Sequence, residues 1–199
     1  MKKAAIIAGA CLVVIIGLII NASFSNMSKF YAKESSGALE IWRGKFAPLG
    51  SEQLIRLDGA VMSDELQKSY TKSEAFSLIF QQYTQKADAL LDAPGTPDFD
   101  QIRATLEKSR PFAITDKLSA EIGRRLKAID MMTLMVKAEV LAGKDTLVGL
   151  EAARDILKKA FRLNLDRAER DLVKQKIQRI NSRIDQLNPT GEPALNSVQ

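Results

Sequence analysis

Carboxylates are the side chains in this sequence with the clearest capacity for chemistry, because a correctly spaced pair can act as general acid and base. Asp98 and Asp100 lie near a predicted helix start, where negative charge is favourable in any case. The other carboxylates considered are Asp116, Glu121 and Asp130. They fall mostly at helix starts and on faces predicted to be exposed, and they form no paired acid constellation. We therefore interpret them as structural residues and predict no catalytic residue.

Other kinds of reactive site lack their characteristic residues. The chain contains no histidine, which removes histidine-based zinc sites and Ser-His or Cys-His nucleophile pairs. Its single cysteine, Cys11, lies inside a long apolar segment, so no intramolecular disulfide can form. Residues 44–50, GKFAPLG, lack the G-x-G-x-x-G spacing of a nucleotide-binding turn. We predict no metal, no cofactor and no enzyme activity, although these absences leave carboxylate or lysine chemistry open.

Charge and composition place the chain in a broad class. An apolar fraction of 46% in 199 residues is typical of one modest globular domain with appendages. The formal net charge is +5, and subtracting Lys2 and Lys3, which precede the apolar segment, leaves +3. Nucleic-acid binding requires a clustered basic face. This charge therefore indicates a mildly basic surface and no nucleic-acid partner.

The apolar segment determines where the protein resides. Residues 4–20, AAIIAGACLVVIIGLII, carry no charge, and the next few residues extend the run. About 20 residues cross the ~30 Å hydrocarbon core, so residues 4–24 can form a transmembrane signal anchor. Signal-peptide cleavage after Ala22 is an alternative, although Ile20 is bulkier than the residue preferred there. A lipoprotein site at Cys11 is a third alternative, but the apolar run continues beyond it. The length of the run favours an uncleaved anchor.

The charges flanking this segment predict its orientation. Lys2 and Lys3 lie immediately before it, whereas Lys29 and Lys33 follow at a distance. Because positive residues concentrate on the cytoplasmic side of a membrane, we expect the amino terminus in the cytoplasm and residues 25–199 outside it. The predicted location is the bacterial cytoplasmic (inner) membrane, with a single span and most of the chain in the periplasm.

Residues 25–62 differ in character from the segments on either side. Short runs rich in strand-forming residues, ALEIWRGK and EQLIRLDG among them, alternate with turn residues in SSG and APLG. We predict a short antiparallel element of two or three strands, as a hairpin or meander. In its middle strand Leu39 and Ile41 would share one face, with Trp42 on the other. Gly44 would mark a bulge.

Trp42, the only tryptophan, has three interpretations. A lone hairpin is marginal in water, so the element must pack on downstream helices, another copy or a partner, and Trp42 would anchor that contact. Alternatively, it lies near lipid headgroups together with Tyr31, Arg43 and Lys45, or on a docking strand that extends a partner's sheet. The packing interpretation is favoured. Trp42, Arg43 and Phe46 are candidate protein-interaction residues.

From residue 63 onward, apolar residues recur at helical spacing. We expect helices over residues 64–92, 97–109, 115–142, 146–163 and 166–187, separated by breaks that mostly contain proline or glycine. Asp166 and Glu169 form a capping-box pattern at the start of the last helix. The helices would form an antiparallel bundle of about five members over residues 63–188, and residues 189–199 would form a disordered tail.

One part of this bundle carries a family resemblance. Residues 138–166, AEVLAGKDTLVGLEAARDILKKAFRLNLD, resemble the middle and end of a tetratricopeptide repeat. Ala153 and Ala160 have the spacing of its small positions, and Leu157 stands at a bulky one. The resemblance covers about one degenerate unit, residues 125–166, because the Trp, Leu-Gly and Tyr pattern, the closing proline and a second copy are missing. It implies a fold that binds peptides or proteins in a groove rather than one that catalyses a reaction.

The last helix carries a short heptad seam. Its apolar residues are spaced four, three, four and three apart: Val173, Ile177, Ile180, Ile184 and Leu187. Two heptads are too few to indicate a coiled coil. Packing against the preceding helix is the default interpretation, and a helix-in-groove or dimer contact is the alternative. Val173, Ile177, Ile180 and Ile184 are therefore the remaining candidate protein-interaction residues.

Together these patterns predict a mainly α protein with an N-terminal transmembrane helix, a short antiparallel β element and a TPR-like helical bundle. The predicted domains are a cytoplasmic N-terminus (1–3), the anchor (4–24), a juxtamembrane β element (25–62), a helical interaction domain (63–188) and a tail (189–199).

The predicted function is that of a non-catalytic adaptor, scaffold or accessory subunit of a bacterial envelope complex. Its expected partners are the lipid bilayer, through residues 4–24, and other envelope proteins, with homo-oligomerisation left open. The alternatives are a soluble periplasmic or secreted binding protein released after Ala22, and a histidine-free envelope enzyme that uses carboxylates.

Overall fold

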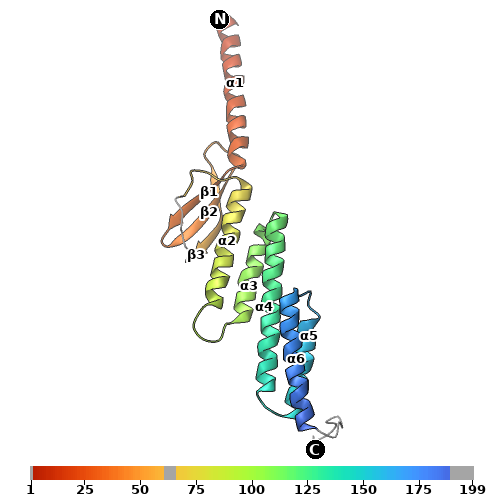
Figure 1. Cartoon of the computed structure of the whole chain (residues 1–199). Helices are drawn as coiled ribbons and strands as arrows, with labels where there is room; N and C mark the ends of the chain where they lie inside the picture. The colour runs from red at the N-terminus through yellow and green to blue at the C-terminus, as the bar shows by residue number, and fades with distance from the viewer. Residues whose placement is uncertain (1, 61–65, 189–199) are drawn as a thin grey trace, which may run out of the picture. The chain divides into compact units, whose positions relative to one another are not determined.

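The computed structural model describes residues 2–60 and 66–188, and this part of the chain is mainly helical. It contains six α-helices and one three-stranded antiparallel sheet (Figure 1). The predicted fold class is confirmed to this extent. The chain divides into two compact units. Unit 1 comprises Met1–Ala89 and Lys108–Ser119, and unit 2 comprises Leu90–Glu107 and Ala120–Gln199. A TPR-like arrangement stays a prediction.

Helix α1, Lys2–Met27, opens unit 1 and is continuous over the predicted span. Its segment Gly9–Met27 is long and apolar enough to cross a membrane, judged by length and composition. The helix continues beyond residue 24, where the predicted span ends, and stops at Met27. The Lys29 N–H then donates to the Asn26 carbonyl at 3.0 Å, which turns the chain directly into the sheet.

The sheet consists of β1 (Phe30–Ser35), β2 (Ala38–Gly44) and β3 (Ser51–Asp58) in that order, all antiparallel. Alternation along β2 separates its two faces as predicted, since Leu39 and Ile41 are fully buried and Trp42 is half-buried. The predicted bulge at Gly44 is wrong. The pairing register with β3 slips between Ile41 and Trp42, which leaves Leu54 as the extra residue.

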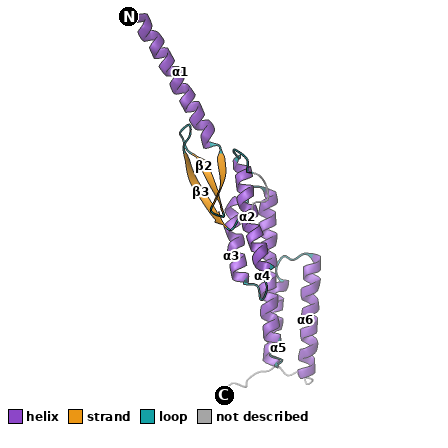
Figure 2. Ribbon diagram, turned by 90° about the vertical axis from the view of Figure 1, so that its left-hand side faces the viewer, coloured by secondary structure: helices purple, strands orange, loops and turns teal. Residues whose placement is uncertain are grey.

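Helix α2, Lys72–Leu91, covers the face of the sheet that carries Leu39 and Ile41 (Figures 1 and 2). Its residues Ala75 and Ile79 are fully buried in this cluster. The element predicted to need a packing partner therefore has one in the next helix. Four aromatic rings extend the same core, with neighbouring centroids 5.3–6.3 Å apart: Phe30, Phe76, Phe112 and Tyr83.

The prediction that this helix begins at residue 64 is wrong. Residues 61–65 lie outside the described residues, and residues 66–71 are not helical. Tyr70 instead pairs with Phe30 through two backbone hydrogen bonds of 2.8 and 2.9 Å. Thr71 then begins the helix, because its side chain and backbone N–H bond with Glu74 in a capping box.

Four further α-helices, α3 to α6, and the short 3₁₀ turn η1 follow α2 along the chain. Helix α3 spans Phe99–Ser109, and η1 spans Arg110–Phe112. The long helix α4 spans Asp116–Ala142, α5 spans Leu147–Phe161 and α6 spans Arg167–Leu187. Each of the four α-helices α3 to α6 begins and ends within two residues of a predicted helix. The predicted tail, residues 189–199, lies outside the described residues.

Within unit 2, α4, α5 and α6 share a common core. Leu150, Ala153 and Ala160 are fully buried, and the small side chains of Ala153 and Ala160 let α5 pack closely on its neighbours. Gly149 serves the same purpose, since a Cβ atom there would lie 2.7 Å from the Leu141 carbonyl oxygen of α4. The capping box predicted for α6 is present, with Asp166 accepting from the Glu169 N–H at 2.8 Å.

Candidate interaction surfaces

The junction between α1 and the sheet is held by one side chain, Asn26. Its amide nitrogen donates to the carbonyl oxygens of Lys45, Ala47 and Gly50 at 3.1, 2.8 and 2.7 Å. Its amide oxygen accepts from the Tyr31 hydroxyl at 2.7 Å. Asn26 is only 5% exposed, so these bonds form out of water and an unmade one would be costly. The last turn of α1 is therefore built into the fold of unit 1.

Gly44 lets the sheet approach α1 this closely. A Cβ atom at residue 44 would lie 1.9 Å from the Asn26 carbonyl oxygen, which is an impossible contact. The Gly44 N–H also donates to the Lys29 carbonyl at 3.0 Å. Close backbone approach, and not a bulge, is therefore the physical reason for glycine at this position.

The β2–β3 loop, residues 45–50, lies beside the end of α1. The Phe46 ring meets the Phe24 ring edge to face, with centroids 5.1 Å apart. Despite this contact, Phe24 and Phe46 are 62% and 56% exposed, and Leu49 is 97% exposed. The loop therefore presents large apolar side chains that nothing in the described chain covers.

Trp42 lies on the outer face of the sheet, opposite the face that α2 covers. Trp42 therefore does not anchor the strands to α2, and its predicted role as an anchor for another copy or a partner stays a prediction. Its indole N–H donates to Glu40 at 3.1 Å, and the Lys33 ammonium lies 5.1 Å from its ring centroid. Arg56 on the neighbouring strand pairs with Glu40 at 2.8 Å. The outer face of the sheet thus carries one half-buried aromatic side chain, Trp42, with paired charged side chains around it.

Arg43 lies on the other side of the strand from Trp42, next to the end of α1. It is exposed, and it lines a cavity of about 320 Å³ with Met27, Ser28, Phe30, Leu54, Lys72 and Phe76. The Lys72 ammonium lies 5.3 Å from the Phe76 ring centroid. The structure therefore places Trp42, Arg43 and Phe46 in three separate environments, although all three belong to one short stretch of sequence.

The predicted seam on α6 faces the core of unit 2. Val173 is fully buried and Ile180 is 7% exposed, and Ile177 and Ile184 pack partly buried against the same clusters. Packing on the preceding helices thus accounts for all four residues. A partner could reach Val173 and Ile180 only if α6 moved away, so their place in an interface stays a prediction.

A shallow groove accompanies this packing on unit 2. Its volume is about 230 Å³, and it is lined by Met135, Ala138, Glu139, Ala142, Gly143, Leu157, Lys176, Arg179, Ile180 and Arg183. Two of its basic residues are paired with α4 or its following turn, Lys176 with Glu139 and Arg183 with Asp145. The groove combines an apolar floor with a mainly basic rim.

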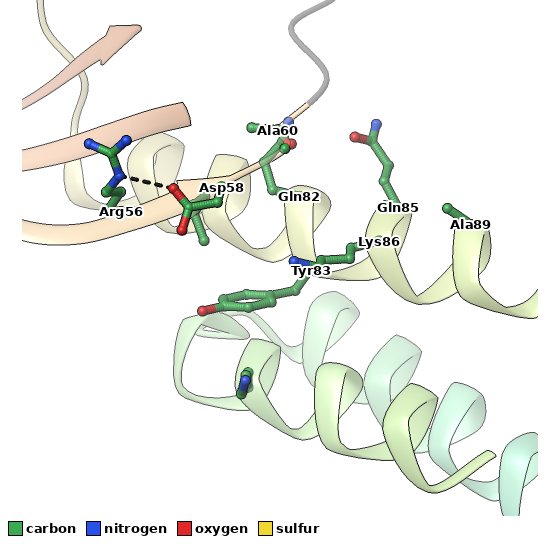
Figure 3. Close-up of a pocket in the computed structure, with 11 residues that line it drawn as sticks. Arg56, Asp58, Ala60, Gln82, Tyr83, Gln85, Lys86 and Ala89 are labelled. Atoms are coloured by element: carbon green, nitrogen blue, oxygen red, sulfur yellow. Dashed lines mark hydrogen bonds and ion pairs between the residues drawn. The ribbon is translucent and has the colours of Figure 1, made fainter. Parts of the chain in front are cut away.

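A third cavity, of about 380 Å³, opens between β3 and α2 (Figure 3). Arg56 and Asp58 pair at 2.9 Å beside the Tyr83 ring, and Lys86 also lines the space. Burial raises the pKa of the Tyr83 hydroxyl above its ordinary value. Asp58 is the only carboxylate among the described residues that line this cavity. The cavity can offer hydrogen bonds to a small polar molecule, and its described lining contains one carboxylate and no carboxylate pair.

No protein-family model, curated protein or solved structure matches this chain. Its function must therefore be argued from its own residues.

Asn26, Phe24 and Leu49 were not selected from the sequence. Their significance depends on contacts between residues about 20 positions apart. The available signal was a polar Asn at the end of an apolar run, followed at that distance by the apolar loop FAPL.

Proposed function

We propose that this chain is a single-pass bacterial membrane protein whose α1 is an uncleaved anchor. The remainder would fold outside the cytoplasm and serve as a non-catalytic interaction subunit of an envelope complex. The observation that carries the proposal is the Asn26 junction. Its four hydrogen bonds join the last turn of the apolar helix to the sheet of unit 1. Such a junction suits a permanent anchor, because it fixes the end of the membrane helix to the folded domain that follows it.

The junction also favours the anchor over signal-peptide cleavage after Ala22. Helix α1 passes through Ala22 without a break and ends five residues later at Met27. Ser23, the first residue of the cleaved form, is only 2% exposed. Cleavage would therefore cut a continuous helix beside a buried position. A soluble binding protein that starts at Ser23 remains the second candidate, because Ala22 is a small residue of the kind that signal peptidase accepts.

Two surfaces can serve partner binding. The outer face of the sheet offers Trp42, and aromatic side chains of this kind often anchor interfaces. The groove of unit 2 offers an apolar floor with basic residues around it, which suits a segment that is both apolar and acidic. The TPR-like resemblance over residues 125–166 points the same way, since it implies peptide or protein binding. Tethering by α1 would raise the effective concentration of either surface for envelope partners.

The experiment that tests the anchor is intact-mass measurement combined with membrane fractionation. The proposal expects the full-length mass in the membrane fraction, resistant to extraction by carbonate and released by detergent. A soluble form beginning at Ser23 would replace this proposal with the second candidate.

The experiment that tests partner binding compares two exposed or half-exposed aromatic residues. Trp42→Ala should reduce the crosslinked partner recovered from native membranes while thermal melting changes little, because Trp42 lies outside the core cluster of unit 1. Phe161→Ala on α5 is the matched control, since Phe161 is 39% exposed and lies in unit 2. Equal recovery from the Trp42→Ala variant and the unchanged protein would remove the outer face from the proposal.

A further inference from the structure

We infer that the β2–β3 loop, residues 45–50, inserts its apolar side chains into the same lipid bilayer that α1 crosses. It would act as a second membrane attachment, made by a loop. This inference rests on the proposed anchor, because it takes α1 to be a membrane span. The exposed apolar side chains of Phe46 and Leu49 would then contact lipid at the membrane interface.

The position of the loop along α1 supports this assignment. Phe46 contacts Phe24, which lies on the N-terminal side of Asn26 and hence nearer the bilayer centre. The chain carries no charge from Ala4 to Ser28, a stretch roughly 37 Å long as a helix. About 20 residues fill the hydrocarbon core, and 20 residues counted from Ala4 end close to Phe24. The tip of the loop therefore lies at the boundary between the hydrocarbon and the headgroups.

Several polar groups of the loop backbone form hydrogen bonds within the protein, as a medium with little water requires. Non-helical chain at membrane depth must have its polar groups satisfied by the protein. The Asn26 amide serves the carbonyls of Lys45, Ala47 and Gly50. The Lys45 N–H donates to the Gly50 carbonyl at 2.8 Å, and the Ala47 N–H donates to the Lys45 carbonyl at 2.8 Å. Each of the three carbonyls that Asn26 serves also accepts from a backbone N–H of the loop, so these carbonyls do not depend on water for a partner.

The side chains of the loop match the same environment. Phe46, Ala47, Pro48 and Leu49 carry no charge, and Pro48 has no N–H that would need a partner. Leu49 is 97% exposed, which no packing within unit 1 explains. Lys45 lies at the start of the loop and pairs with Glu52 at 3.4 Å, both about half-exposed. Polar residues thus border the apolar tip, as expected where a chain enters the interface from water.

The test uses the full chain and a single tryptophan at a time. Because Trp42 is the only native tryptophan, Trp42→Phe provides a background without emission, and Leu49→Trp is added to it. The protein is reconstituted in phosphatidylcholine–phosphatidylglycerol vesicles whose acyl chains are brominated at defined depths. We expect bromines near the headgroups to quench the Leu49→Trp emission clearly, and bromines near the chain ends to quench it less, because the loop inserts only at the interface. Glu34→Trp in the same background is the control, since Glu34 is exposed near the far end of β1, and its emission should persist.

A third variant separates failure of this inference from failure of the proposed anchor. Ile16→Trp lies in the middle of α1, so deep bromines should quench it if α1 spans the bilayer. Quenching at residue 16 without quenching at residue 49 would overturn the loop assignment and leave the anchor intact. No quenching at either residue would overturn both. Blue-shifted emission from residue 49 that bromine does not quench would assign the loop to a protein contact and overturn the lipid assignment.

Discussion

At the residue scale, the side chain of Asn26 makes more hydrogen bonds between elements of unit 1 than those of its neighbours in the sequence. One amide group joins the end of α1, β1 and the β2–β3 loop, through four hydrogen bonds. A smaller side chain could not replace them, because the three loop carbonyls converge on a single nitrogen. The stability of unit 1 should therefore depend strongly on this residue.

Asn26→Ala is expected to lower the free energy of unfolding of unit 1 by about 2–4 kcal/mol, since it removes four side-chain hydrogen bonds at a buried position. The measurement is chemical unfolding of the detergent-solubilised protein followed by Trp42 fluorescence. Ser28→Ala is the control, because it removes a single exposed bond from Ser28 to the Ser25 carbonyl and should cost no more than about 0.5 kcal/mol. Equal losses from the two variants would contradict the role assigned to Asn26.

Gly44 and Gly123 should respond to alanine in opposite directions. Gly44→Ala places a methyl group onto the Asn26 carbonyl and should destabilise the protein by about 1–3 kcal/mol. Gly123 lies inside α4 with open space around its Cα, so Gly123→Ala should stabilise the helix by roughly 0.5–1 kcal/mol. Thermal melting followed by circular dichroism measures both changes. A neutral Gly44→Ala variant would show that the close approach of α1 and β2 is absent in solution.

At the scale of elements, the start of α2 should be sensitive to acid. Hydrogen bonds from the Thr71 backbone N–H and hydroxyl lower the pKa of Glu74 below its ordinary value of 4.5. A lowered pKa contributes stability above the unfolded-state pKa, and this contribution is lost as pH falls from about 4.5 through the folded-state pKa. The melting temperature of the unchanged protein should therefore exceed that of Glu74→Gln at neutral pH, and the difference should shrink below pH 4.5. A difference that is independent of pH would contradict the capping role of the carboxylate.

Elements with their own local signals could be predicted from the sequence, and elements defined by distant contacts could not. The capping box of Asp166 and Glu169 and the alternation of Leu39, Ile41 and Trp42 depend on spacing alone, and both are present. The start of α2 was misplaced because Tyr70 pairs with Phe30, a bond across 40 positions that overrides helical periodicity.

Local pattern was also insufficient for the candidate site. Alternation identified the face on which Trp42 lies, but not that α2 would cover the opposite face. Gly44 was expected to form a bulge because the approach of α1 depends on residues of another element. Asn26 was overlooked for the same reason, since a single polar residue at the end of an apolar run has many ordinary explanations.

At the scale of the whole molecule, the charges around α1 predict which side of the membrane holds the folded units. Lys2 and Lys3 lie immediately before the apolar run, whereas Lys29 and Lys33 follow it at a distance. The asymmetry is modest, so a single added or removed charge should alter it measurably. A periplasm-dependent reporter, such as alkaline phosphatase, fused after Gln199 is expected to be active, and a cytoplasm-dependent reporter at the same position is expected to be silent.

Replacing both Lys2 and Lys3 by glutamine provides the matched variant for this topology prediction. Without these lysines, the positive residues after the span outnumber those before it, so a measurable share of the chains should insert in the reverse orientation. Activity of the periplasmic reporter should then fall and activity of the cytoplasmic one should appear. Replacing Lys144 and Lys159 by glutamine removes the same charge at positions far from α1 in the sequence and should leave both reporters unchanged. Cytoplasmic reporter activity from the unchanged protein would overturn the predicted orientation while leaving the hydrogen bonds of the Asn26 junction untouched, because those bonds do not depend on which side of the bilayer unit 1 occupies.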